Sequence, residues 1–331
     1  EVTSINRGEK TVAVKNLDTG EECVYPYDKL VIGTGAVPAV PPIPGIHSEG
    51  VYYLRTVEDG IRLKATVQRE AKSAVIIGGG FIGLELAEEL TLSGVSVTIF
   101  EQLPRLLPFL DPVFSQSVLE NLERHGVNVH TGTGVAEILT QDGRARWVRT
   151  PQGETLETDI VLVSAGVKPA SGLAGQAGLA LGLKQGRIAG GNVAGGHDTF
   201  KGVLGSTVTK VFEQYIASTG LSLEQAQAAG FQAVSTMITK MDRASYYPGG
   251  RDNQICLIFD RKTGRLLGAQ GIGSESIAGR INVLATAITC GMTVEAVNEL
   301  DLVYAPPVAP VYDPILIAAS QAVKKVEKQL K

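Results

Sequence analysis

The sequence predicts an α/β protein whose central part is a Rossmann-like unit built on a parallel sheet. Between residues 73 and 168, short apolar stretches typical of buried strands alternate with longer stretches typical of helices. The glycine-rich hexapeptide Gly78–Gly83 follows one of these strands directly and opens a helix. An acidic residue, Glu101, stands at the end of the next strand. This order of strand, glycine turn, helix and acid is typical of dinucleotide-binding folds.

The remaining elements of this central part follow from its apolar periodicity and its turn residues. The helix after the glycine turn is expected to carry Glu88 and Glu89 on its outer face, and Gly126 is expected to end the next helix. Asp142 and Gly143 form the predicted turn between two shorter strands. The expected strands are 74–77, 95–100, 134–140, 145–150 and 159–164, and the expected helices are 81–92 and 112–125.

The two flanking parts show other patterns. Residues 1–50 are predicted to be β structure, with a strand at Thr11–Lys15, an apolar run at Lys29–Gly33 and an extended, proline-rich connector through Pro44. In the C-terminal part, strands and helices frame a proline-rich loop at 305–307. The expected strands there are 233–240, 254–259 and 266–271, and the expected helices of the two flanks are 57–71, 275–290 and 314–331.

Length, charge and cysteine spacing limit the classes of function. A chain of 331 residues is expected to hold two or three domains. A net charge of −4 and an aromatic content of 5% argue against nucleic acid and anionic membranes as partners. No apolar stretch reaches the length needed to span a bilayer, and no metal site is predicted. The three cysteines are widely separated, which favours a reducing, cytoplasmic location.

The glycine turn predicts a site for a nicotinamide dinucleotide. Gly78 would allow the tight turn, Gly80 would let the backbone approach the pyrophosphate, and Gly83 would let the helix pack closely on the strand. Glu101 would accept a hydrogen bond from the adenosine ribose 2′-hydroxyl and repel a 2′-phosphate. We therefore expect NADH to be preferred over NADPH, although the nearby Arg105 could soften that preference.

Several segments together resemble the FAD-dependent pyridine nucleotide-disulfide oxidoreductases. Among the branches of that family, the chain is most similar to coenzyme A disulfide reductases, NADH oxidases and persulfide reductases. The segments that carry the resemblance, each weak alone but specific in their order and spacing, are 27–36, 41–45, 78–85, 101 with 104–108 and 111, 165–169, 217–220, 246–249 and 304–307.

The resemblance implies a domain organisation and a set of partners. Residues 1–72 and 170–200 would be remnants of an FAD-binding domain, into which the NAD-binding domain, residues 73–169, is inserted. Residues 201–331 would form an α+β dimerisation domain, and the active site would be shared across a homodimer. The cofactors would be FAD and NADH, and the small-molecule acceptor would be a disulfide, a persulfide or coenzyme A disulfide.

The resemblance also implies roles for individual residues. Thr34 and Gly35 are similar to backbone contacts of FAD, and Gly166 stands where the nicotinamide half can approach the backbone. Glu85 is similar to an acid near the flavin–nicotinamide interface. Tyr304 is similar to a tyrosine that reaches the partner subunit's flavin and sulfur site, where a phenol can donate a hydrogen bond to a developing thiolate.

A second such tyrosine is implied at Tyr247 or its neighbour Tyr246. Val311 and Tyr312 stand where relatives that bind coenzyme A can carry a lysine, which places coenzyme A itself in question as the substrate. Cys256 and Cys290 are expected to be buried and unreactive rather than nucleophilic.

Three features of the family do not occur in this sequence. An FAD fingerprint and a reactive cysteine would precede Glu1, and a flavin-contacting segment would fall between Lys184 and Gln185. Two alternatives therefore stay open beside the disulfide or persulfide reductase. One is an NADH oxidase or peroxidase, and the other is a non-catalytic NAD-binding sensor or structural protein.

Overall fold

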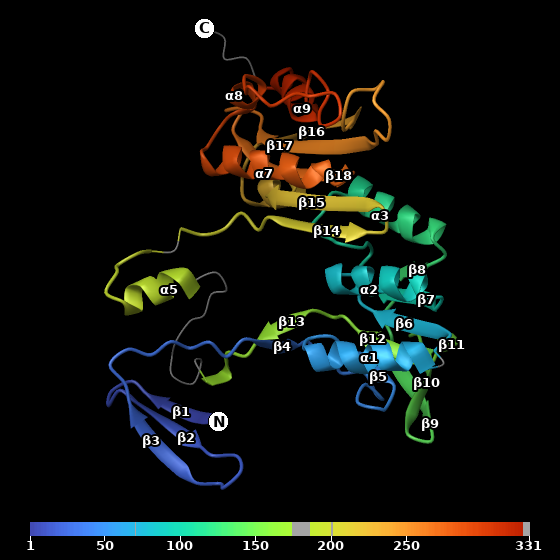
Figure 1. The fold of residues 1–331 in the computed structure, drawn as a ribbon, viewed down its shortest axis with the longest axis vertical. Coiled ribbons are helices and arrows are strands. Elements are labelled where there is room, and N and C mark those ends of the chain that lie inside the picture. Colours follow the sequence, from blue (N-terminus) through green and yellow to red (C-terminus); the bar gives the residue numbers. More distant parts are fainter. Residues whose placement is uncertain (70, 174–185, 200, 327–331) are drawn as a thin grey trace. The chain divides into compact units, whose positions relative to one another are not determined.

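The computed structural model describes residues 1–69, 71–173, 186–199 and 201–326. The chain forms two compact units, of which the first comprises Glu1–Ala39 with Gly166–Val203 and the second comprises Val40–Ala165 with Leu204–Lys331. The fold is α/β, as the sequence predicted, with a parallel sheet in the second unit (Figure 1).

The first unit contains a small antiparallel sheet and one short strand pair. The sheet has the order β1-β2-β3, and β4 pairs with β13 in antiparallel register. The bounds are β1 Val2–Asn6, β2 Thr11–Lys15, β3 Glu22–Pro26, β4 Ala36–Pro38, β13 Val167–Pro169 and α5 Gly186–Val193. The apolar run Lys29–Gly33 is not a strand: Val31 is 59% exposed, and no strand of the described chain pairs with this run.

The second unit begins with a five-stranded parallel sheet of order β5-β12-β6-β7-β8. Because the chain leaves β6 outward to β7 and later returns on the other side to β12, the strand order reverses at β6, which is where doubly wound sheets bind ligands. The bounds are β5 Val51–Tyr53, α1 Val57–Arg69, β6 Ser73–Ile77, α2 Phe81–Leu92, β7 Ser96–Glu101, α3 Pro112–Arg124, β8 Asn128–Thr131 and β12 Ile160–Val163.

Alternating side chains of the parallel sheet enter two different cores. Ile76 and Leu162 pack with residues of α2 and α3, whereas Val75 and Val161 pack against a small antiparallel sheet. That sheet has the order β11-β10-β9, with bounds β9 Glu137–Gln141, β10 Arg144–Arg149 and β11 Thr155–Glu157. Positive φ angles at Asp142 (52°) and Gly143 (81°) make the predicted tight turn between β9 and β10.

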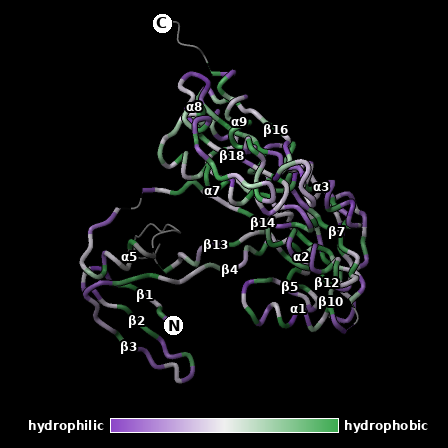
Figure 2. Tube along the Cα trace, turned by 45° about the horizontal axis from the view of Figure 1, so that its top comes forward, coloured by the Kyte–Doolittle hydropathy of each residue, from purple (hydrophilic) through white to green (hydrophobic). Residues whose placement is uncertain are grey.

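The C-terminal part of the second unit is a five-stranded antiparallel sheet of order β14-β15-β18-β17-β16. Helices α7 and α9 pack on one face of it (Figures 1 and 2). The core beneath α2 and α3 continues to its other face through residues such as Ile216 and Ile258. The bounds are β14 Thr207–Val211, β15 Gln214–Gly220, α6 Leu223–Ala228, β16 Ala233–Met241, β17 Asp252–Asp260, β18 Leu266–Gly273, α7 Ser276–Thr289, α8 Val294–Asn298 and α9 Pro314–Val323.

The packing of α2 against the C-terminal sheet corrects one sequence expectation. Glu89 is exposed as expected, but Glu88 is only 7% exposed. Its carboxylate accepts hydrogen bonds from Lys210 Nζ at 2.7 Å and from the backbone N of Phe212 at 2.8 Å. Phe212 has a φ of 52°, so the chain turns sharply between β14 and β15 and directs this N–H at the helix. The sequence of α2 alone carries no sign of this neighbour.

Candidate functional site

The glycine turn, Gly78–Gly83, begins where β6 ends. Gly78 has a φ of 108°, a conformation that side chains with a Cβ rarely adopt. A Cβ on Gly78 would stand 2.5 Å from Ser164 O at the end of the neighbouring strand β12. Its backbone N donates to Phe100 O at 2.8 Å, which ties the turn to β7. Position 78 therefore requires glycine for the fold itself.

The other two glycines of the fingerprint have different surroundings. A Cβ on Gly83 would collide with Gly78 O, so glycine there lets α2 pack directly on the turn. Gly80 is the N-cap of α2, and a Cβ added to it would meet nothing within 4 Å. No side chain caps the N-terminus of α2 at Gly80. Open space beside uncapped backbone N–H groups is what a dinucleotide pyrophosphate needs, so this turn fits a nicotinamide dinucleotide.

Glu101 ends β7 with its carboxylate against the glycine turn. Oε2 accepts from the backbone N of Gly79 at 2.7 Å, and Oε1 accepts from the backbone N of Leu103 at 2.7 Å. These bonds hold the carboxylate in place while leaving lone pairs on both oxygens for a ligand hydroxyl. Arg105 does not turn toward Glu101: its guanidinium bonds Glu224 at 2.9 Å and Pro108 O at 3.2 Å. The predicted ribose contact of Glu101 stays a prediction.

Glu85 lies on the exposed side of α2, one turn before Glu88. Its Oε1 accepts from the hydroxyl of Thr209 on β14 at 2.7 Å. Glu85 lines a cavity of about 480 Å³ whose other walls include Ile82, Glu89 and Lys210. A carboxylate with one oxygen held and the other free could bind or orient a polar ligand group there, so a functional role for Glu85 remains a proposal.

The predicted tyrosines lie on two loops of the C-terminal part, residues 242–251 and 303–313, called here the tyrosine loops. Tyr304 is 48% exposed and its phenol is hydrogen bonded to that of Tyr246, which raises the pKa of Tyr304. Tyr247, which the resemblance named together with Tyr246 for the second role, has its backbone N bonded to Ala244 O at 2.9 Å. The structure thus pairs Tyr304 with Tyr246, and nothing in the phenol contacts favours Tyr247.

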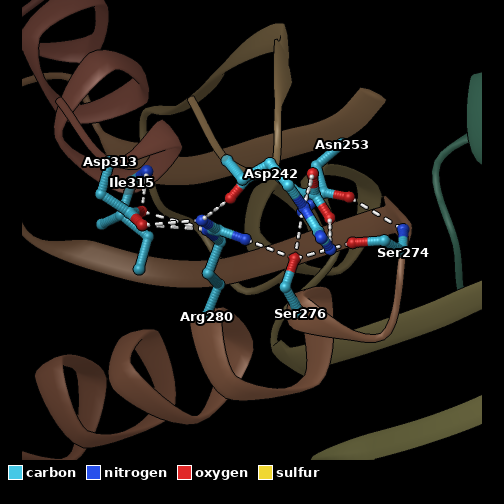
Figure 3. A network of polar contacts seen from close by, with 8 residues as sticks. Asp242, Asn253, Ser274, Ser276, Arg280, Asp313 and Ile315 are labelled. Atoms are coloured by element: carbon cyan, nitrogen blue, oxygen red, sulfur yellow. Dashed lines mark hydrogen bonds and ion pairs between the residues drawn. The ribbon is translucent and has the colours of Figure 1, made fainter. Parts of the chain in front are cut away.

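A buried polar network around Arg280 of α7 anchors both tyrosine loops (Figure 3). The Arg280 guanidinium donates to the Asp313 carboxylate at 2.9 Å, to Asp242 O at 2.9 Å and to the hydroxyl of Ser276. Asp313 also caps α9 by accepting from the backbone N of Ile315 at 2.9 Å. The loops meet directly where the backbone N of Ala244 donates to Pro306 O at 3.2 Å. No sequence pattern indicates this network, because its members lie far apart along the chain.

The residues predicted to contact the flavin lie in the first unit. Thr34 Oγ1 donates to Ala170 O at 2.6 Å, and Ala170 N donates to Gly35 O at 2.9 Å. Gly35 and Gly166 have φ angles of 68° and 95°, and a Cβ on either would meet nothing within 4 Å. These residues offer open backbone to a flavin, but they include no second glycine turn to hold its pyrophosphate. The position between Lys184 and Gln185 lies outside the described residues.

The three cysteines have different surroundings. Cys256 is 3% exposed, and burial, together with the charge of Asp111, raises its thiol pKa to about 12. Its Sγ lies 3.7 Å from the Asp111 carboxylate. Such a thiol is unreactive at neutral pH, in line with expectation. Cys290, expected to be buried, is exposed, because it caps the C-terminus of α7 where the helix reaches the surface. Cys23 is exposed on β3.

Two family models together match most of the chain. The pyridine nucleotide-disulphide oxidoreductase model matches residues 1–190, and the dimerisation-domain model of the same family matches residues 207–314. Each helix in the described part of the chain is too short or too polar to cross a membrane.

Similar proteins agree with these matches. The chain is 32% identical to an NADH oxidase of Methanocaldococcus jannaschii, covering 99% of this chain and 83% of the relative. It is 31% identical to an NAD(P)H coenzyme A polysulfide/persulfide reductase of Pyrococcus horikoshii, covering 92% of this chain and 78% of the relative. The solved structure of an NAD-dependent persulfide reductase from A. fulgidus superposes with a TM-score of 0.93 at 36% identity, covering 98% of this chain and 68% of that one.

The alignment with the M. jannaschii protein spans 376 positions, more than the 331 residues here, so that relative carries residues with no counterpart in this chain. One family assignment nevertheless follows from the family matches, the identities above 30% and the near-complete coverage of this chain. The chain belongs to the pyridine nucleotide-disulphide oxidoreductases, a family of enzymes that use FAD and a nicotinamide dinucleotide.

Proposed function

We propose that the chain is the nicotinamide-binding and dimerising part of a reductase that transfers electrons from NADH, through FAD, to a small sulfur compound. The observation that carries the proposal is the glycine turn. Substitution at Gly78 or Gly83 would collide with backbone, whereas Gly80 faces open space at the start of α2. Of the three fingerprint glycines, the fold requires Gly78 and Gly83 but not Gly80. A ligand that approaches the backbone at Gly80 would account for the glycine there.

The chain's own residues would hold NADH at both ends of its adenosine half. The backbone N–H groups at the start of α2 would bind the pyrophosphate, and Glu101 would accept from the ribose 2′-hydroxyl. When bound, FAD supplies the two-electron relay between the nicotinamide and the sulfur. Thr34, Gly35 and Gly166 offer backbone that could contact these cofactors, and Glu85 could orient the nicotinamide carboxamide through its free oxygen.

We favour a persulfide, polysulfide or coenzyme A disulfide as the acceptor. Two of the three relatives described above carry a persulfide activity in their names. Tyr304 supports this choice chemically. When a sulfur–sulfur bond is reduced, the leaving sulfur develops negative charge, and a neutral phenol can donate a hydrogen bond or a proton to it. A phenol is protonated at neutral pH, and the hydrogen bond with Tyr246 raises the pKa of Tyr304 further above that range.

The proposal includes a homodimer in the cytoplasm. The match of residues 207–314 to the dimerisation-domain model supports self-association. Large apolar side chains are exposed along one tyrosine loop, among them Val303 at 85% and Val311 at 66%, as expected of a surface that another subunit covers. All three cysteines are free, which agrees with a reducing location.

A second candidate function is the reduction of oxygen or peroxide. The M. jannaschii relative, named as an NADH oxidase, is 32% identical to this chain, against 31% and 36% for the two persulfide reductases, and this similarity favours the alternative. The third sequence-based alternative, a non-catalytic sensor, has no support from the comparisons, because the family consists of enzymes.

The test compares electron acceptors with the full-length protein. We expect a flavin absorbance spectrum, and NADH consumption that depends on polysulfide or coenzyme A disulfide more than on oxygen or peroxide. Activity with only the last two would replace the sulfur acceptor by the oxidase alternative. A protein that holds no flavin and takes up none when FAD is added would overturn the proposal.

A variant and a matched control test the role of Tyr304. Tyr304→Phe should lower kcat with sulfur acceptors by about 100-fold, the lower end of what a positioned proton donor contributes. The affinity for NADH should not change. Tyr25→Phe removes a phenol of similar exposure, 54% against 48%, and should leave kcat unchanged. Equal kcat values for the Tyr304→Phe variant and the parent protein would exclude Tyr304 from the reaction.

A further inference from the structure

Arg105 is the only cationic residue in the segment that follows Glu101, through Asp111. Its guanidinium is held by α6 of the C-terminal part: Nη2 lies 2.9 Å from Glu224 Oε2 and also donates to Pro108 O at 3.2 Å. The Arg105 side chain is 26% exposed and that of Glu224 is 64% exposed. Nε of Arg105 is buried and meets no hydrogen-bond partner among the described residues. The guanidinium therefore has unused donor capacity in its present position.

The backbone beside Arg105 lies next to the predicted ribose site. Glu101 accepts from the backbone N of Leu103, and the side chain of Leu106 contacts the position where a Cβ on Gly79 would stand. Glu101 Oε2 lies 3.3 Å from that same position. Residues 103 and 106 thus both border the end of the glycine turn where the adenosine ribose would bind. Position 105 lies between residues 103 and 106, so the long side chain of Arg105 begins beside the predicted ribose site.

The orientation of the Arg105 guanidinium affects the choice between the two cofactors, because they differ at the ribose 2′ position. NADP carries a phosphate in place of the ribose 2′-hydroxyl, and an arginine beside the site is the residue that accommodates it. The planar guanidinium matches the phosphate in charge and in hydrogen-bond geometry. Glu101 repels this phosphate, so the discrimination between the cofactors depends on whether a cation is present to compensate.

We propose that Glu224 is a specificity-determining residue for the nicotinamide cofactor. By holding Arg105 on α6, it withholds a nearby cation from a 2′-phosphate and thereby strengthens the NADH preference that Glu101 creates. The inference rests on the proposed function of the glycine turn. It assigns part of the cofactor choice to a residue on helix α6, more than a hundred positions further along the chain.

The test is a binding measurement on the purified full-length protein, with NADH and NADPH as the probes and their fluorescence as the signal. Glu224→Gln removes the carboxylate charge and keeps the side-chain shape. We expect the Kd for NADPH to fall about fivefold, comparable to gaining one partly exposed ion pair, while the Kd for NADH stays within about twofold. Adding Arg105→Ala to Glu224→Gln should return the Kd for NADPH to the parent value.

A matched control shows whether any lost surface ion pair has the same effect. Glu49→Gln breaks the ion pair with Arg144, in which Glu49 is 74% exposed, and should change neither Kd. An unchanged NADPH-to-NADH affinity ratio in Glu224→Gln overturns the inference, and so does a gain that persists after Arg105→Ala. If the parent protein binds neither nucleotide, the proposed function itself fails. NADH binding without the predicted shift rejects the role of Glu224 alone.

Discussion

The glycine turn and the tyrosine loops differ in which groups they offer to a ligand: backbone groups in the turn and side chains in the loops. In the turn, the backbone itself is the candidate site: Gly78 and Gly83 fit only without a Cβ, and Gly80 faces open space. In the tyrosine loops, exposed side chains are the candidate groups, and a buried network centred on Arg280 holds the backbone beneath them (Figure 3). The first arrangement depends on neighbours in sequence, and the second depends on residues from several distant elements.

This difference predicts where each region is sensitive to substitution. The turn should be damaged by adding a single methyl group, whereas the loops should tolerate changes at their exposed tips and fail at their buried base. Four substitutions, taken from the largest expected effect to the smallest, test this contrast.

Arg280→Met should cause the largest loss of stability. It leaves the carboxylate of Asp313 and the carbonyl of Asp242 buried without their partner, and Asp242 and Asp313 are 1% and 8% exposed. Breaking such a buried pair costs about 3–5 kcal/mol in the free energy of unfolding, measurable by denaturant titration. Adding Asp313→Leu to Arg280→Met should recover part of the loss. A single variant as stable as the parent protein would mean that the network does not anchor the loops.

Gly78→Ala should destabilise the turn almost as strongly. The new Cβ would stand 2.5 Å from Ser164 O in a backbone with a φ of 108°. Strain and steric overlap together should cost about 2–4 kcal/mol, again read from denaturant unfolding. Gly279→Ala, in α7 with nothing within 4 Å of the added Cβ, is the matched control and should not destabilise the protein. Equal stability of the two variants would contradict the described geometry.

Gly80→Ala should separate binding from folding. Its Cβ meets no protein atom within 4 Å, so the free energy of unfolding should stay within about 0.5 kcal/mol of the parent value. The same methyl group would block the approach of a pyrophosphate to the backbone. We expect the Kd for NADH to rise about tenfold or more, equivalent to about 1.4 kcal/mol. If stability falls and affinity does not, the open space at Gly80 is not a ligand site.

Tyr246→Phe should have the smallest effect, which acts through the pKa of Tyr304. Without the hydrogen bond, the pKa of Tyr304 should fall back toward its ordinary value. A raised folded-state pKa stabilises the protein below the ordinary phenol pKa, and that contribution is lost as the pH rises through the raised value. Tyr246→Phe should therefore lower the stability slightly at neutral pH, where the contribution is fully present, and leave it unchanged at pH values above the raised pKa. NMR titration of ring-labelled tyrosine measures the pKa, and Tyr247→Phe, which lacks the phenol contact, is the control.

Much of the fold could be predicted because its signals are local. Apolar alternation and a turn residue were enough to place β6, α2 and the Asp142-Gly143 turn, since each depends on the conformational preference of a few consecutive residues. The short strands β8 and β11 went unpredicted, because three or four residues carry too little pattern and gain their order from pairing. The run at Lys29–Gly33 has an apolar pattern but forms no strand, because no neighbouring strand among the described residues pairs with it.

In the candidate site too, the features set by local sequence could be predicted and those set by tertiary contacts could not. The sequence by itself determined the glycine turn and the acid at Glu101, because a glycine requirement and a strand end are properties of the local backbone. Only the tertiary structure decided that Glu88 is buried, that Tyr246 is the partner of Tyr304, and that Glu224 holds Arg105. In each of these cases, a hydrogen bond or ion pair depends on the distance between atoms that folding brings together. Sequence spacing does not contain that distance once the partners lie on different elements.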